Sequence, residues 1–174
     1  TTSPDGTMTN IKQGPDPRFG MQSSIVEALK ITTPLGLTLT RNMTRSVTLV
    51  DPRDLLSVAS LTDTKTLNGR VSTNVYNALT KTWTATSAAG RQVRTTIDTV
   101  GRPVIQAITG IDPVNFSYDA RGRLSGITQG SAGSQRTTQM AYNAQGYLSQ
   151  VTDALSRSTT YTYDLAGRVT QETF

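Results

Sequence analysis

The sequence contains no cysteine and no histidine among its 174 residues. Disulfides, thiolate zinc sites and histidine-based acid–base chemistry are therefore excluded within the chain. No apolar run approaches the roughly 20 residues of a membrane-spanning helix, so we expect no membrane span. We also find no phosphate-binding loop and no cluster of metal ligands. The sequence thus predicts no cofactor and no metal site.

What the chain has in abundance is threonine, at 31 residues, whereas apolar residues make up only 35%. Valine, isoleucine, leucine and tyrosine are scattered singly rather than in blocks. Threonine and valine suit a pleated, half-buried surface, and their branched β-carbon disfavours helices. This composition predicts an all-β fold.

The chain is basic, with a formal charge of +5 and a pI near 9.8. One reading is a basic face for nucleic acid or anionic lipid. The other is a turn rule, in which an arginine directly follows the glycine of a turn. The sequence has five arginines in this position. We favour the turn rule and expect no nucleic-acid partner. The five residues are Arg70, Arg91, Arg102, Arg123 and Arg168.

A short pattern, Tyr-Asx-x-x-Gly followed by Arg or Tyr and then Leu or Val, recurs without gaps at 118–124, 142–148 and 163–169. The copy that begins at Ile97 keeps the aspartate and the glycine, and the copy at 76–81 has Thr80 in the glycine place. The copies begin at 76, 97, 118, 142 and 163, a period of 21 with one step of 24. Such a period predicts a stack of small β units.

Each clear copy has an Asp or Asn three residues before its glycine. The side chain of an Asp or Asn at the first position of a turn forms a hydrogen bond to the backbone two residues later. Glycine can adopt the positive φ that a hairpin with a glycine bulge needs. Each period also has a second turn, and we therefore expect eight to fourteen strands. These second turns precede Arg70, Arg91, Arg136 and Arg157. We assign the extra three residues to a loop insertion at 130–134. The predicted turn residues are Asp98, Gly101, Asp119, Gly122, Asn143, Gly146, Asp164 and Gly167.

Bulky residues alternate with plain ones before each turn, as in Phe116, Ser117 and Tyr118. An alternation with a period of two residues, with the rings on one side, predicts a strand that has one packed face. The rings should then form a ladder along that face. The predicted ladder consists of Tyr76, Tyr118, Tyr142 and Tyr163, with Ile97 in the remaining place.

Residues 1–61 are read as divergent strands of the same sheet, and 62–174 as the repeats proper. Strands are expected at 24–30, 35–40 and 47–50, and turns at 3–6 and 14–17. The stretch 50–56 is read as a decayed hairpin with Asp54 in the glycine place. The chain opens without methionine and stops inside a repeat, so we expect it to be part of a longer protein.

These motifs resemble the YD-repeat family, also called RHS repeats, specifically over 62–174 and more loosely over 1–61. Members include bacterial polymorphic-toxin cores, cocoon subunits of insecticidal toxin complexes, wall-associated proteins and teneurins. The resemblance implies one long curved sheet of antiparallel hairpins, part of a hollow β-shell or tube. In the toxin proteins the shell encloses a C-terminal toxic domain that is released by self-cleavage. The nearest match to that cleavage motif, 51–55, lacks its glycine, and we reject it.

The leading hypothesis is a non-enzymatic structural shell or fibre-wall element of a large bacterial protein that is secreted or at the cell surface. Its partners would be further repeats or identical copies, with an encapsulated C-terminal domain or surface glycans as additional ones. Alternatives are a glycan- or cell-binding adhesion module and a cocoon segment of a polymorphic toxin. An enzyme is disfavoured, because Asp98, Asp119 and Asp164 are better explained as turn caps than as acid–base groups; no catalytic residue is predicted.

Overall fold

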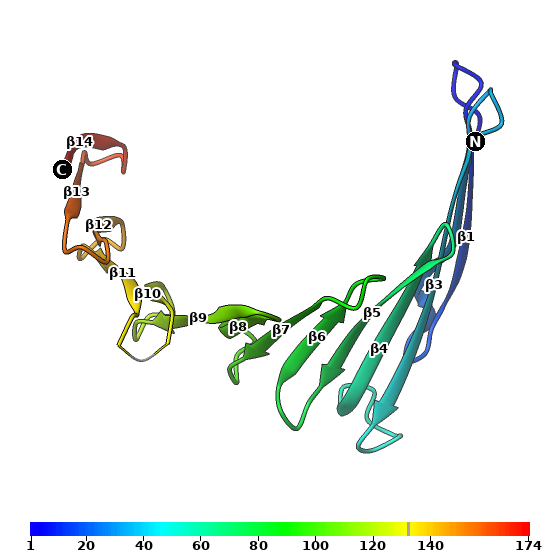
Figure 1. The fold of residues 1–174 in the computed structure, drawn as a ribbon, viewed down its shortest axis with the longest axis horizontal. Coiled ribbons are helices and arrows are strands. Elements are labelled where there is room, and N and C mark those ends of the chain that lie inside the picture. The colour runs from blue at the N-terminus through cyan, green and yellow to red at the C-terminus, as the bar shows by residue number, and fades with distance from the viewer. Residues whose placement is uncertain (132) are drawn as a thin grey trace. The chain divides into compact units, whose positions relative to one another are not determined.

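The computed structural model describes residues 1–131 and 133–174, and the regular elements in them are all β-strands (Figure 1). Fourteen strands form one sheet in which the order of strands follows the order of the sequence. The all-β fold of consecutive antiparallel hairpins is therefore confirmed. By their contacts the residues divide into two compact units, Thr1–Thr96 and Ile97–Phe174.

The strands of the first unit shorten from 13 residues in β2 to five in β6 and six in β7. Each pairs antiparallel with the next, from β1 and β2 through β6 and β7. The strands are β1 (Met8–Asp16), β2 (Gly20–Thr32), β3 (Thr38–Leu49), β4 (Val58–Leu67), β5 (Arg70–Asn77), β6 (Thr82–Thr86) and β7 (Gln92–Ile97).

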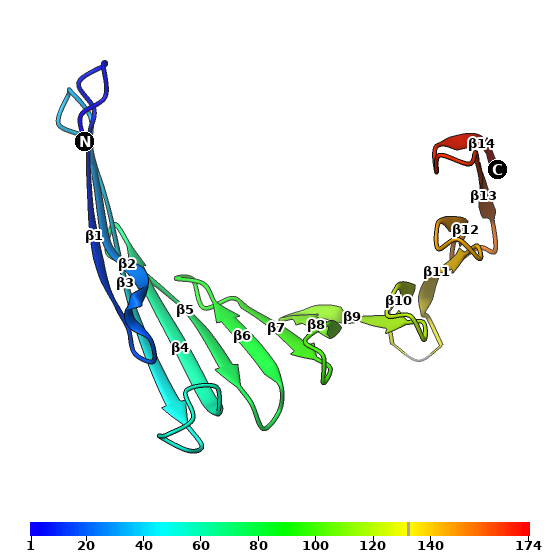
Figure 2. The same ribbon diagram turned by 180° about the vertical axis from the view of Figure 1, so that it is seen from behind.

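The second unit carries strands of five to eight residues, again in antiparallel neighbouring pairs from β8 to β14 (Figure 2). The backbone pairing of several neighbouring strands is interrupted by a register shift beside a repeat turn, as between Leu124 and Gly126. The strands are β8 (Pro103–Ile108), β9 (Ile111–Tyr118), β10 (Leu124–Gln129), β11 (Arg136–Tyr142), β12 (Leu148–Thr152), β13 (Ser158–Tyr163) and β14 (Val169–Thr173).

Three local expectations need correction. Residues 35–37 belong to the turn that precedes β3, because Gly36 takes a φ of +80° and its amide donates to the Thr33 carbonyl. Residues 14–16 continue β1 rather than turn, since Gly14 still pairs with Ile25 across a bulge. In the copy at 76–81, Lys81 rather than Thr80 has the positive φ, +51°. The stretch 24–30 is a strand, as expected, within β2.

The expected insertion at 130–134 lies between β10 and β11, so it spares both strands. Ala132, in its middle, lies outside the described residues. The Ser134 amide donates to the Ser131 carbonyl.

The sheet of the first unit has two faces of different chemistry. The register places Thr44, Thr64, Thr73 and Thr86 side by side across β3 to β6. We call the face that bears them the hydroxyl face. The opposite face bears Tyr76 and Trp83, also directly paired, and we call it the ring face.

Burial is shallow on both faces. Among the described residues the only apolar side chain that counts as buried is Leu61, at 7% exposure, on the ring face. A single sheet layer has no second layer to cover either face, so backbone pairing and contacts between neighbouring side chains must hold it together.

Candidate functional site

The repeat turns share one geometry in the second unit. The first residue, Asp or Asn, donates its amide to the carbonyl four residues on, at 2.8–3.0 Å, and accepts the glycine amide on its own carbonyl. One side-chain oxygen then accepts the amide four residues on, at 2.9–3.0 Å. The glycines at these turns, Gly101, Gly122, Gly146 and Gly167, have φ between +77° and +97°.

In four turns the aspartate also binds the side chain of the arginine four residues on. The arginine Nε donates to the second carboxylate oxygen at 2.7–2.8 Å. The pairs are Asp98–Arg102, Asp119–Arg123, Asp153–Arg157 and Asp164–Arg168. The arginine charge is thus neutralised inside its own turn, which is the physical basis of the turn rule at these positions.

Hydrogen bonding lowers the pKa of these carboxyl groups. The pKa of Asp98, Asp119 and Asp164 lies below its ordinary value chiefly because the backbone amide four residues on donates to the carboxylate. For Asp153 the Arg157 side chain is the larger cause of the lowered pKa. The four groups are therefore held ionised as turn caps.

One turn of this kind lacks its glycine. Ser156 occupies the place and takes a φ of +64°, although its amide still donates to Asp153 as a glycine would. A residue with a β-carbon is strained in this left-handed region, whereas glycine is not.

We therefore expect Ser156→Gly to stabilise the protein by about 1 kcal/mol. Urea unfolding would measure the change. Ser149→Gly, in strand β12, is the control and should destabilise, because glycine weakens a strand interior. A Ser156→Gly variant less stable than the parent would contradict the assignment.

A second motif links each of these hairpins to the one before it. Tyr118 donates its hydroxyl to the Pro103 carbonyl at 2.7 Å, and the Arg102 guanidinium lies 4.4 Å from the centre of its ring. The next hairpin repeats this arrangement with Tyr142, whose hydroxyl binds the Leu124 carbonyl at 2.7 Å. Its ring lies 4.2 Å from the Arg123 guanidinium. We call each such contact a rung.

The third rung uses a ring in place of the guanidinium. Tyr163 donates to the Leu148 carbonyl at 2.7 Å and stacks on Tyr147, with ring centres 4.9 Å apart and planes 28° apart. Cation–π and aromatic pairs contribute about 0.5–1.5 kcal/mol each. Each tyrosine thus joins its own hairpin to the carbonyl and the side chain of the preceding one.

The glycines of two of these turns face the rungs. A β-carbon on Gly122 would lie 2.8 Å from Arg102 Nη1, and one on Gly167 would lie 2.5 Å from the Tyr147 hydroxyl. Gly101, by contrast, has nothing within 4 Å of that position. A larger residue at Gly122 would therefore displace Arg102, and one at Gly167 would displace Tyr147, in addition to straining the backbone.

Tyr76, the remaining predicted ladder residue, has a different environment in the first unit. Its ring packs on Trp83 of the partner strand, with ring centres 4.9 Å apart. The structure places Tyr118, Tyr142 and Tyr163 in equivalent rungs and Tyr76 in a cross-strand pair.

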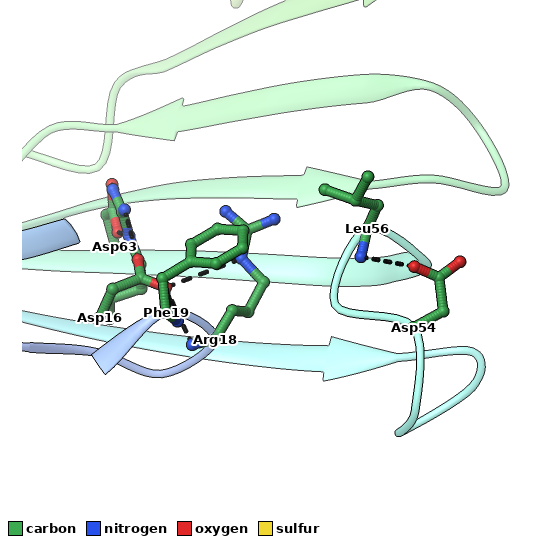
Figure 3. A network of polar contacts seen from close by, with 7 residues as sticks. Asp16, Arg18, Phe19, Asp54, Leu56 and Asp63 are labelled. Atoms are coloured by element: carbon green, nitrogen blue, oxygen red, sulfur yellow. Dashed lines mark hydrogen bonds and ion pairs between the residues drawn. The ribbon is translucent and has the colours of Figure 1, made fainter. Parts of the chain in front are cut away.

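The first unit contains an ionic cluster that the sequence analysis missed (Figure 3). Arg45 of β3 binds Asp63 through two nitrogens, at 2.7 and 2.9 Å, and Asp16 through a third, at 3.1 Å. The two carboxylate side chains are 1% and 11% exposed at Asp16 and Asp63. Arg18 lies beside Asp16 and over the Phe19 ring. The cluster fastens the tip of the β1–β2 hairpin to β3 and β4.

The pKa values in the cluster follow from these contacts. Burial alone would raise the pKa of Asp16. Hydrogen bonds from the Arg18 amide, the Arg45 guanidinium and the Phe19 amide outweigh it and bring that pKa below its ordinary value. The hydrogen bond to Asp63 raises the pKa of Arg45. Asp16 and Arg45 are therefore both charged at neutral pH.

In the described part of the chain, no group of three or more acidic, histidine or cysteine side chains is placed to hold a metal ion. None of residues 1–131 and 133–174 belongs to a helix long and apolar enough to span a membrane. What the geometry does provide is attachment of one hairpin to the next.

The sequence pattern of the teneurin YD-shell matches residues 5–172, nearly the whole chain. The chain belongs to the teneurin YD-shell family. No curated protein sequence matches it.

The chain is also similar to parts of solved structures. The Tc holotoxin pore of Photorhabdus luminescens, with a mutant TccC3, matches 99% of the chain at 12% identity with a TM-score of 0.50. A TcdB2–TccC3 complex matches 95% at 12% identity with a TM-score of 0.47. The chain spans about a tenth of the length of each of those proteins, 10% in both cases.

The lowered carboxyl pKa values predict how the stability of this YD-shell segment depends on pH. A carboxylate whose pKa is depressed by folding contributes stability above its unfolded value of about 3.9 and loses it as the pH falls through the folded value. With no histidine to titrate, stability should be flat from about pH 5 to 8.

We therefore expect the urea midpoint to fall steeply only below about pH 4. Unfolding curves at several pH values would measure this. The Asp119→Asn variant is the control, because it should lose part of that acid dependence. A midpoint that stays constant or rises between about pH 4.5 and 3 would contradict the prediction.

Proposed function

We propose that this YD-shell segment is a non-enzymatic wall element of a large secreted or cell-surface bacterial protein that acts as a scaffold or container. The rungs carry this proposal, because Tyr118, Tyr142 and Tyr163 each rest on the hairpin before their own. Such an arrangement adds units in one direction with each contact made to the nearest neighbour.

The hydrogen bonding of the turn carboxylates supports a non-enzymatic role. A general acid or base needs a free oxygen within reach of substrate. In the repeat turns Asp98, Asp119 and Asp164 instead place one oxygen on backbone amides and the other on arginine. Likewise, the tyrosine rings that could stack sugars already lie against arginine or tyrosine, so no specific observation favours the adhesion module.

The container role rests on membership of the YD-shell family and on the fold shared with the Tc proteins. In a container the sheet would close on itself or pair with further repeats, because open strand edges promote aggregation. Within the described residues, β1 pairs only with β2 among the named strands, and β14 only with β13.

Sedimentation velocity of the isolated chain tests the wall role. We expect self-association through the outer strands, which Gln171→Lys combined with Thr173→Lys on β14 should reduce, because lysines on an edge block strand pairing. Gln139→Lys combined with Ala141→Lys, on the interior strand β11, adds the same charge and should not reduce it. A monodisperse monomer that unfolds cooperatively would favour a self-contained binding module.

A further inference from the structure

Two arginines that follow a glycine lack the aspartate partner that the arginines of the second unit have in their own turns. Arg70 comes after the two-residue turn of Asn68 and Gly69, which joins Leu67 directly to it. Arg91 comes after a turn that begins at Ser87, whose hydroxyl accepts the Arg91 amide. Neither turn supplies an aspartate, so the charge of these arginines is not neutralised as it is in the second unit.

Both arginines border an open groove of about 720 Å³ on the ring face of β4 to β7. Its floor is formed by Ala85 and Val93, which the register places opposite each other. Lys65 completes a set of three exposed cations with Arg70 and Arg91. Among residues 1–131 and 133–174, none of the three takes part in an ion pair.

The single acidic residue that borders the groove does not balance this charge. Asp63 gives both carboxylate oxygens to Arg45, at 2.7 and 2.9 Å. The groove therefore presents three uncompensated positive charges around a small, apolar floor. Its volume lies within the range of about 300–1,000 Å³ that is typical of ligand sites.

We propose that this groove binds an extended acidic segment of another polypeptide. One large apolar side chain of that segment lies over Ala85 and Val93, and flanking carboxylates meet Arg70, Arg91 and Lys65. Arg70 begins β5 and Arg91 directly precedes β7. These two strands are two strand spacings apart, about 10 Å, or about three residues of extended chain. The role is additional to the wall function and does not depend on it.

The floor argues for a peptide rather than a polysaccharide. Sugar-binding grooves use exposed rings as stacking platforms, but the nearby rings, Tyr76 and Trp83, pack on each other and do not border the groove. Small side chains at Ala85, Ala88 and Ala89 leave room for an incoming leucine or phenylalanine. Arginine in turn binds carboxylates through two parallel hydrogen bonds.

Fluorescence polarisation with a labelled peptide that contains Glu-Asp-Leu-Phe-Glu-Asp tests the proposal on the intact chain at low salt. Arg70→Glu and Arg91→Glu should each weaken binding about tenfold or more, because each reverses a contacting charge. Ala85→Trp, which fills the floor without changing the charge, should weaken it similarly. The control is Arg94→Glu, the same charge reversal on the opposite face of β7, which should change the affinity less than about twofold.

Circular dichroism of each variant would establish that the sheet is intact, and Arg70→Gln offers a milder change at the same position. A peptide with Gln and Asn in place of Glu and Asp should not bind. Failure of the acidic peptide to bind, or equal weakening by Arg94→Glu, would overturn the proposal. So would a hyaluronan oligosaccharide that binds in place of the peptide.

Discussion

Replacing Arg45 by methionine is expected to destabilise the protein by about 3 kcal/mol, the lower end of the range for breaking a buried ion pair. The change leaves Asp16 and Asp63 facing each other with their shared cation gone, and Asp16 almost fully buried. We place the effect at the lower end because Arg45 itself keeps 23% of its side chain exposed. Urea unfolding followed by the fluorescence of Trp83, the single tryptophan, would measure it.

Two comparisons separate this loss from a general effect of removing a charge. Arg94→Met, on the hydroxyl face, should cost less than about 0.5 kcal/mol, as is usual for an exposed site. Adding Asp63→Asn to Arg45→Met should recover much of the loss, since the remaining carboxylate, Asp16, still has Arg18 beside it. The deficit of the single variant should also shrink in acid, where protonation removes the charge of Asp16. A deficit equal to that of Arg94→Met would show that the cluster contributes little.

The second large effect is expected at Gly122. Gly122→Val should cost about 3 kcal/mol: about 2 for a branched residue at a φ of +81°, and about 1 because the new β-carbon displaces Arg102 from the Tyr118 ring. Gly101→Val is a matched control, with φ of +87° and open space around it, and should cost only the backbone part.

The difference between the two losses of stability measures the contribution of the contact between Arg102 and Tyr118. In an Arg102→Ala background, where the displaced side chain is already gone, Gly122→Val and Gly101→Val should cost the same. A difference that survives in that background would mean that the contact with Arg102 is not its cause.

The repeat turns could be predicted from the sequence because their signals are local. An Asx three residues before a glycine specifies a hairpin by itself, and the period of 21 places hairpin after hairpin in the same sheet. Alternation of bulky and plain residues, as at Phe116 and Tyr118, also indicated which face carries the rings. Both signals depend on spacing within a few residues.

The cluster at Arg45 and the rungs depend instead on register and on bulges. Arg45 contacts Asp63 because β3 and β4 pair at that register. It contacts Asp16 because the tip of the β1–β2 hairpin lies beside β3. Similarly, Tyr142 reaches Arg123, 19 positions earlier in the sequence, only through the pairing of β10 with β11. A recurring Arg or Tyr directly after the turn glycine was the available signal for the rungs.

The proposed wall role is tested most directly by a cryo-electron microscopy structure of the protein in its assembled state. In the last turn Arg168 is 81% exposed, against 35% and 27% for Arg102 and Arg123, whose rungs are filled. We expect β14 to pair with a further strand and a tyrosine ring to lie under Arg168, with its hydroxyl on the Val169 carbonyl. A structure in which β14 faces solvent and Arg168 remains uncovered would contradict the account.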